Sequence, residues 1–235
     1  HYKFNQEKFE KIAKICEIFS FRVIAVMGNR TNAYEKQIIS LAYRIYNNLD
    51  IDDVLKQFCE WIFQKGSMNE VLKKLGNGET KYYHDPSAKG WRECYYFLYE
   101  YEISITSGSA RPRNFASHNE SKKNEQEHIM PKEHRDNAWW ESHWPDGNKA
   151  DKYKHRLGNL TLTNDGESNR ILGRKQIGKK INDPSDDYSY DHVRATSSEK
   201  KILGYTDGEN WNEEEILNRE YDLLQFASER WSVPC

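Results

Sequence analysis

Apolar residues in the first hundred positions recur at intervals of three and four, which is the spacing of one face of an α-helix. Each such stretch carries an apolar stripe on one side and polar residues on the other. A stretch rich in Gly, Pro, Asp and Ser, "GNGETKYYHDPSAKG", separates the last two of them and predicts a loop. The predicted helices cover residues 9–19, 38–49, 54–62 and 91–102.

A different pattern begins after a helical region at 1–106. The stretch "SGSARPRNFASHNESKKNEQ", residues 107–126, is polar and poor in apolar residues, which predicts an irregular connector. "EHIMP" and the alternating "NLTLT" then predict two short strands. Residues 168–181 predict a helix, although its two glycines each weaken it by about 1 kcal/mol relative to alanine. This order predicts an α+β chain, mostly helical, with a small core at 127–181.

The C-terminal extension, residues 182–235, ends in a strongly patterned helix. Asn212 followed three residues later by Glu215 resembles a capping box at a helix start. Apolar residues repeat at helical spacing over 217–231, and Pro234 ends the pattern. We expect this helix to pack on the core.

Composition and charge limit the classes of protein. No apolar run approaches the roughly 18 residues of a membrane-spanning helix, so no membrane partner is expected. The four cysteines form no CxxC pair, which argues against a zinc knuckle or a disulfide framework and fits a reducing cytoplasm. The net charge of −2 taken over the whole chain argues weakly against binding to nucleic acid. The charges are segregated, however: residues 169–181 contain five cations and no acid, while acidic residues gather at 209–222.

A histidine and two asparagines fall in an order that suits a one-metal nuclease. His128 lies in the first predicted strand, Asn159 enters the second, and Asn169 begins the predicted helix. Histidine has a pKa near neutrality and can deprotonate water, whereas an asparagine oxygen suits a hard divalent cation. Alternation in "NLTLT" turns Asn159 toward the first strand, where its amide is expected to orient the imidazole.

These motifs together resemble the C-terminal HNH-type, or His-Me finger, nuclease domain of GmrSD-like modification-dependent restriction endonucleases. The resemblance rests on "EHIMP", on "HRLGNLTLT" with an asparagine ten residues after its own, and on "WNEEEILNREYDLLQFASERWSVP". It covers roughly residues 90–235, including the "WRECYYFLYEYE" helix. What it implies is a ββα-metal fold and endonuclease activity on double-stranded DNA, with modified phage DNA among the substrates, in the cytoplasm of a prokaryote.

The resemblance also assigns roles to residues. His128 matches the catalytic histidine, Asn159 the "GNLTL" asparagine and Asn169 the helix asparagine, while Glu127 matches a metal-ligand position. The third residue of the HNH pattern is Asn169 in place of the usual histidine, and its amide oxygen favours Mg²⁺ or Mn²⁺ over softer ions. Glu127 can share a site with His128 only if the strand twists or bulges, because adjacent strand residues point to opposite faces. The basic residues expected to line DNA are Arg170, Arg174, Lys175, Lys179 and Lys180.

The family usually joins this domain to an N-terminal nucleotide-hydrolysing sensor domain. Because the chain begins at His1 without a methionine, we expect it to be a fragment that lacks this sensor. Two other functions compete with the DNA endonuclease: a catalytically inactive HNH-fold module that binds DNA or protein, and an RNase effector. His155, four residues before Asn159, is a candidate accessory residue. The tryptophans of "WWESHW" predict either a packed loop or base stacking. The sequence indicates no oligomeric state.

Overall fold

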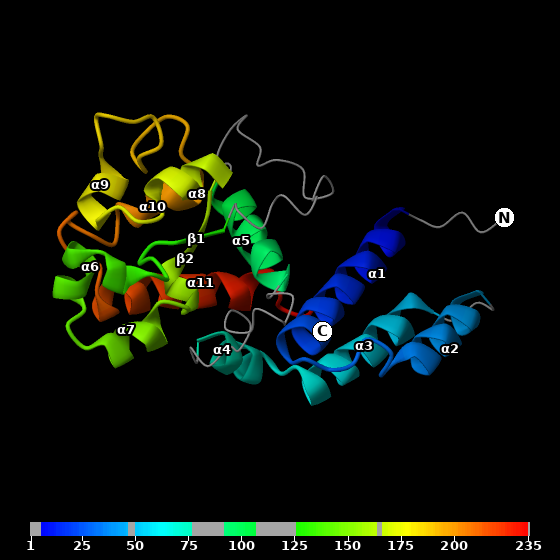
Figure 1. Ribbon diagram of the computed structural model, residues 1–235. Helices are drawn as coiled ribbons and strands as arrows, with labels where there is room; N and C mark the ends of the chain where they lie inside the picture. Colours follow the sequence, from blue (N-terminus) through cyan, green and yellow to red (C-terminus); the bar gives the residue numbers. More distant parts are fainter. Residues whose placement is uncertain (1–5, 47–49, 77–91, 107–125, 164–165, 235) are drawn as a thin grey trace. The chain divides into compact units, whose positions relative to one another are not determined.

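A computed structural model describes residues 6–46, 50–76, 92–106, 126–163 and 166–234 (Figure 1). The chain is mostly helical and contains a small two-stranded antiparallel sheet, an α+β arrangement. It divides into an N-terminal unit, which comprises residues up to Leu75 together with Ala227–Cys235, and a central unit, Gly76–Phe226. The four segments drawn from the sequence, 1–106, 107–126, 127–181 and 182–235, stay a prediction.

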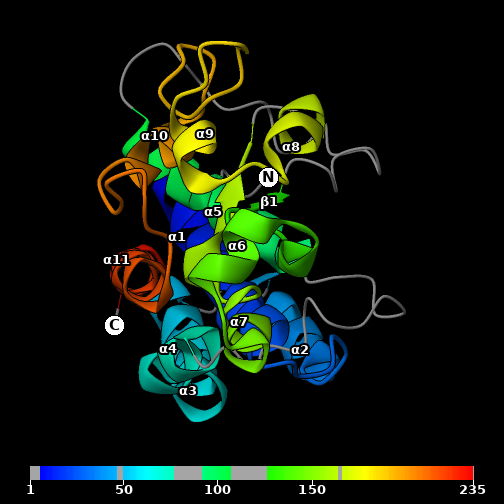
Figure 2. The same cartoon turned by 60° about the vertical axis from the view of Figure 1, so that its left-hand side comes forward.

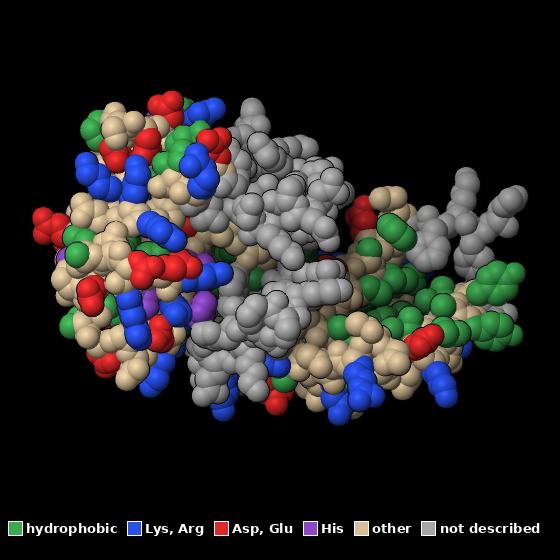
Figure 3. All heavy atoms as spheres, in the orientation of Figure 1, with side chains coloured by type: hydrophobic (Ala, Val, Ile, Leu, Met, Phe, Trp, Pro, Cys, Tyr) green, Lys and Arg blue, Asp and Glu red, His purple; other side chains and the backbone are tan. Residues whose placement is uncertain are grey.

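The N-terminal unit is built from helices. They are α1 (Gln6–Phe19), which continues into a π-helical segment (Ser20–Val26), then α2 (Glu35–Tyr46), α3 (Ile51–Lys65) and α4 (Met68–Gly76). The first three predicted helices are confirmed, whereas α4 was not predicted. Several large hydrophobic side chains on these helices stay exposed, and Figure 3 shows hydrophobic side chains on the surface of this unit. They are Phe9, Ile39, Tyr43, Tyr46 and Phe63.

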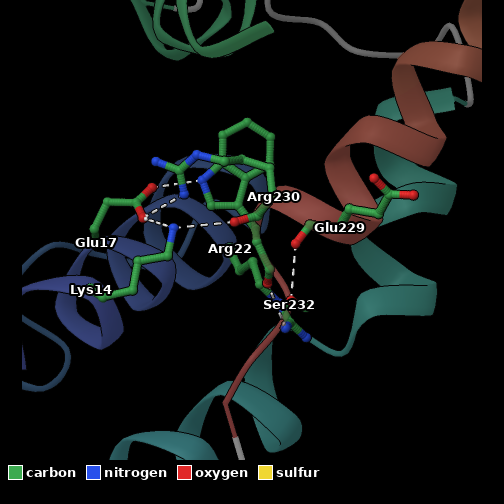
Figure 4. Close-up of polar contacts among 7 residues, drawn as sticks. Lys14, Glu17, Arg22, Glu229, Arg230 and Ser232 are labelled. Atoms are coloured by element: carbon green, nitrogen blue, oxygen red, sulfur yellow. Dashed lines mark hydrogen bonds and ion pairs between the residues drawn. The ribbon is translucent and has the colours of Figure 1, made fainter. Parts of the chain in front are cut away.

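The end of the chain is fastened to α1 within this N-terminal unit (Figure 4). Glu17 of α1 accepts hydrogen bonds from Arg230 at 3.0 Å and from the indole nitrogen of Trp231 at 2.6 Å. Lys14 donates to the carbonyl of Arg230 at 3.2 Å. The Trp231 ring stacks on Phe21 with centroids 3.8 Å apart. The terminal helical turn is therefore part of this unit's core.

In the central unit, helices surround a single pair of strands. Strand β1 (Gln126–His128) pairs antiparallel with β2 (Leu160–Leu162), and His128 lies opposite Leu160. The connection between the strands contains two short α-helices that were not predicted. Of the two interpretations of its tryptophans, the packed loop agrees with the structure, because Trp140 and Trp144 are buried in the core. The helices of this unit are α5 (Arg92–Ile105), α6 (Ala138–His143), α7 (Gly147–Tyr153), α8 (Gly166–Leu172), α9 (Ile177–Ile181), α10 (Ser197–Ile202) and, as far as Phe226, α11, whose full range is Glu213–Arg230.

Two sequence predictions about helices have different outcomes. The single helix predicted at 168–181 is wrong, because α8 and α9 are separated by a turn around Gly173 in which the Lys175 nitrogen donates to the Leu172 carbonyl at 2.9 Å. The start of α11 is confirmed. The Asn212 nitrogen donates to the Glu215 carboxylate at 2.7 Å, and the Asn212 side chain accepts from the Glu214 nitrogen at 2.8 Å.

Two further expectations concern the membrane and the cysteines. Within the described ranges, no helix combines the length and the apolar character needed to cross a membrane. Cys16 and Cys94 are thiols, but Cys59 is disulfide-bonded. The expectation of reduced cysteines is therefore wrong for Cys59, and cysteine usage gives no support to a reducing compartment.

Candidate functional site

His128 ends β1 and faces a second histidine. The Nε2 atom of His128 lies 3.3 Å from the Nδ1 atom of His155, and the two rings are perpendicular, with centroids 5.3 Å apart. Both residues are buried, with exposed fractions of 8% for His128 and 5% for His155. His155 lies in the turn between α7 and β2, so the fold brings together two residues 27 positions apart. The candidate accessory residue is thus in direct contact with the candidate base.

Asn159 clamps the two segments that carry these histidines. Its side-chain oxygen accepts from the Met130 nitrogen at 2.8 Å and from the indole of Trp211 at 2.9 Å. Its amide nitrogen donates to the Met130 carbonyl at 2.9 Å and to the Lys154 carbonyl at 2.8 Å. These bonds use both donors and both acceptor positions of the amide. The expected contact of Asn159 with the imidazole of His128 is therefore replaced by hydrogen bonds to the backbone of Met130 and of Lys154.

Asn159→Asp is expected to lower the free energy of unfolding by about 2 kcal/mol, because the carboxylate keeps the shape of the amide but cannot donate to the two buried carbonyls. Asn148→Asp is the matched control, since Asn148 is exposed on α7, and it should change stability by less than about 0.5 kcal/mol. Urea denaturation of both variants measures the difference. Equal stability of the two would contradict the clamp.

Glu127 points away from the histidine pair. Its carboxylate forms an ion pair with Lys180 of α9, and both side chains have an exposed fraction of 0%. Lys180 also donates to the His128 carbonyl at 3.2 Å. The strand keeps its alternation at this point, so the assignment of Glu127 as a metal ligand beside His128 is corrected to an interior partner of Lys180. Lys180, expected to contact DNA, cannot do so from this position.

A second buried acid lies near this ion pair. Figures 1 and 2 both show α9 beside α10, and α10 carries Glu199. Burial, together with the nearby Glu127, raises the pKa of Glu199 to about 8. At neutral pH Glu199 therefore carries a proton, and Lys180 is matched to one carboxylate. Burial lowers the pKa of Lys180, an effect that the Glu127 carboxylate opposes.

The remaining expected DNA contacts differ in their availability. Lys175 is held between Asp183, at 2.9 Å, and Asp186. Arg170 is exposed and pairs with Glu167 at 3.1 Å on the same helix, while Arg174 and Lys179 are exposed. Figure 3 shows acidic and basic side chains interspersed on this face. The run of cations thus yields three exposed side chains where five were expected: Arg170, Arg174 and Lys179.

The environment of His128 favours the neutral imidazole. Burial lowers its pKa well below 6.5, and the charges of Lys132, His155, Lys180 and Lys154 act in the same direction. Lys132 and Lys154 were not singled out from the sequence. Asn159 donates to the carbonyl of Met130, two residues before Lys132, and to the carbonyl of Lys154 itself. A base that is neutral at pH 7 and lies among cations suits a reaction on a phosphate.

Residues 70–226 match the family model described as GmrSD restriction endonucleases, C-terminal domain. The chain belongs to this family. The match covers well over half of the chain and includes His128, His155, Asn159 and Asn169, so the resemblance noted in the sequence is confirmed. Membership supports nuclease activity in general and implies DNA as the substrate of the domain. Neither a curated protein nor a solved structure gave a significant match to the chain.

A metal in this GmrSD-type domain would find few protein ligands among the described residues. In those ranges no group of three or more His, Cys, Asp or Glu side chains is placed to hold a metal ion. The backbone of Asn169 lies in α8, the helix that follows β2 along the chain. Its side chain is outside the described part of the structure. A single amide oxygen fits an ion such as Mg²⁺, which keeps several waters and binds substrate phosphate, and does not fit tetrahedral zinc.

The other histidines near the site in sequence have structural surroundings. His134 is buried on the turn before α6, and burial lowers its pKa. His143 stacks on the Trp139 ring with centroids 3.7 Å apart, and its Nδ1 atom lies 2.7 Å from the Trp139 carbonyl oxygen. Neither belongs to a metal cluster among the described residues. The nearby histidine that contacts His128 is His155.

Proposed function

We propose that the chain is a metal-dependent DNA endonuclease, the effector part of a modification-dependent restriction system that acts against phage. In this proposal β1, β2 and α8 form a ββα-metal core of the HNH type. The observation that carries it is the buried His128–His155 pair at the end of β1, within the stretch that matches the restriction endonuclease family. A nucleotide-hydrolysing sensor domain would supply the recognition of modified DNA.

His128 is the general base of the proposed reaction. The neutral imidazole takes a proton from a water molecule, and the water oxygen attacks the phosphorus of the scissile phosphodiester. The bond between phosphorus and the 3′ oxygen breaks, which leaves a 5′ phosphate and, after the departing oxygen takes a proton from solvent, a 3′ hydroxyl. The low pKa of His128 keeps the base available at neutral pH, since little of it is protonated before the reaction.

Asn169 is the proposed ligand of a divalent cation, Mg²⁺ or Mn²⁺. When bound, such an ion supplies positive charge beside the scissile phosphate and the departing oxygen. Asn159 does not touch the reacting groups in this scheme. It positions the base by holding the Met130 backbone two residues further along the chain. Arg170, Arg174 and Lys179 are the proposed contacts to the DNA backbone, and Lys132, exposed near His128, joins them.

A supercoiled-plasmid assay tests the proposed function. We expect nicking or linearisation in Mg²⁺ or Mn²⁺ and none in EDTA, with unmodified plasmid and modified phage DNA run in parallel. A structured RNA at the same concentration separates the RNase alternative, because an RNase effector would cleave it and leave the plasmid intact. Binding of plasmid without cleavage under every metal condition would support the inactive DNA-binding module instead.

The acid side of the pH profile of cleavage is expected to lie below pH 6.5. Burial and the neighbouring cations lower the pKa of His128, so protonation inactivates the base only at a pH well below that of an ordinary histidine. Stability follows the same sign. Above pH 6.5 this group does not affect the free energy of unfolding, whereas below it the unfolded chain binds a proton that the folded chain excludes, and stability decreases. Single-turnover rates from pH 5 to 8 check this, and half-maximal cleavage above pH 6.5 would contradict it.

A further inference from the structure

The contact between the two histidines restricts where protons can lie. Two ring nitrogens at 3.3 Å can share one hydrogen. Two N–H groups facing each other would repel, and two facing lone pairs would form no hydrogen bond with each other in a buried position. A neutral imidazole carries its proton on one nitrogen only. The direction of this single hydrogen bond therefore decides which nitrogen of His128 is basic.

From this geometry we infer that His155 is a positioning residue that selects the tautomer of His128. The Nε2–H group of His128 donates to Nδ1 of His155, which leaves Nδ1 of His128 as the nitrogen that takes the proton from water. The opposite direction would put a proton on Nδ1 of His128 and remove its basicity at that atom. This inference rests on the proposed function, because the base role of His128 sets the direction.

Burial and the backbone clamp make the contact stable enough for this role. Both rings are largely buried, so water competes little for the two nitrogens in contact, Nε2 of His128 and Nδ1 of His155. Asn159 fixes the carbonyl of Lys154, the residue before His155, and both polar backbone groups of Met130, two residues after His128. When His128 has accepted its proton, the resulting imidazolium still donates through Nε2 to a neutral His155. The positive charge then has a hydrogen-bond acceptor in a buried position.

Two substitutions separate this role from simple packing. Asn at position 155 places an amide oxygen where Nδ1 of the histidine lies, so His155→Asn keeps an acceptor, whereas His155→Leu fills the volume without one. We expect His155→Leu to lower kcat by roughly 100-fold or more, with KM for DNA within about twofold of the wild type. His155→Asn should recover kcat to within about tenfold of the wild type. His192→Leu, at a half-buried histidine beside Asp187, is the control for loss of an imidazole elsewhere.

Long-range ¹H–¹⁵N correlation spectra of histidine-labelled protein read the tautomer without any cleavage. We expect His128, assigned by its absence in His128→Gln, to be protonated at Nε2 in the wild type and in His155→Asn, and to lose this preference in His155→Leu. Protonation at Nδ1 in the wild type, or a kcat of His155→Leu equal to that of the wild type, would overturn the inference. Failure of the wild type to cleave any nucleic acid would instead refute the proposed function, and the spectra would still decide the tautomer.

Discussion

Lys180→Met is expected to lower the free energy of unfolding by about 3–5 kcal/mol, because it leaves the Glu127 carboxylate buried without its cation. Both side chains have no exposed surface, so solvent cannot screen the uncompensated charge. Methionine is close to lysine in length and keeps the packing of its aliphatic part. The loss is therefore electrostatic rather than steric, and urea denaturation at pH 7 measures it.

Two controls make this prediction specific to the ion pair. Lys179→Met removes the neighbouring exposed lysine and should change stability by less than about 0.5 kcal/mol. The double variant Glu127→Gln with Lys180→Met removes both charges and should recover most of the loss. DNA affinity should fall more in Lys179→Met than in Lys180→Met, because the exposed Lys179 can contact a phosphate and the buried Lys180 cannot. A Lys180→Met protein as stable as Lys179→Met would refute the buried pair.

Gly158→Ala is the second large effect, an expected loss of about 3 kcal/mol or more in the free energy of unfolding. A Cβ atom at this position would lie 2.0 Å from the carbonyl oxygen of Ile216 and 3.0 Å from the Cβ atom of Glu220, both on α11. The helix cannot yield easily, because Arg219 of α11 donates to the carbonyls of Gly158, at 2.8 Å, and Leu160, at 2.7 Å. The substitution must therefore push a helix backbone away from the start of β2.

Gly204→Ala is the matched control for this substitution. The nearest atom to a Cβ there is the Lys201 carbonyl oxygen at 3.4 Å, an ordinary contact, so the change should be close to neutral. Thermal unfolding of the two variants gives the comparison. Cleavage should also fall in Gly158→Ala, because Asn159 follows directly and holds the segments of the histidine pair. Equal melting temperatures for the two alanine variants would contradict the close approach of α11.

The helical part of the fold was largely predictable from the sequence. The stripes of α1, α2, α3 and α5 and the capped start of α11 follow a period that depends only on local residue order. The helices α6 and α7 were missed because their apolar positions are few. Each is six or seven residues long and begins at an Asn or Asp cap, Asn137 and Asp146, within a polar stretch.

The candidate site was predictable in its residues but not in its contacts. His128 and Asn159 stand out by motif, whereas the partner of each depends on the tertiary fold. The position of Lys180 among other cations predicts a contact with DNA, but α9 turns this lysine inward to Glu127. The role of Gly158 becomes apparent only from α11, which begins 55 residues further along the chain (213 − 158). Pairings between distant residues carry no local signal.

The most direct test of the account compares wild type and His128→Gln in single-turnover cleavage of supercoiled plasmid in Mg²⁺, with DNA affinity measured in the same buffer. Glutamine keeps a polar side chain at the end of β1 but has no nitrogen that can accept a proton at neutral pH. The account predicts that the cleavage rate falls by about 10²–10⁴-fold while DNA affinity stays within about twofold. Cleavage by His128→Gln at the wild-type rate would contradict the assignment of His128 as the base.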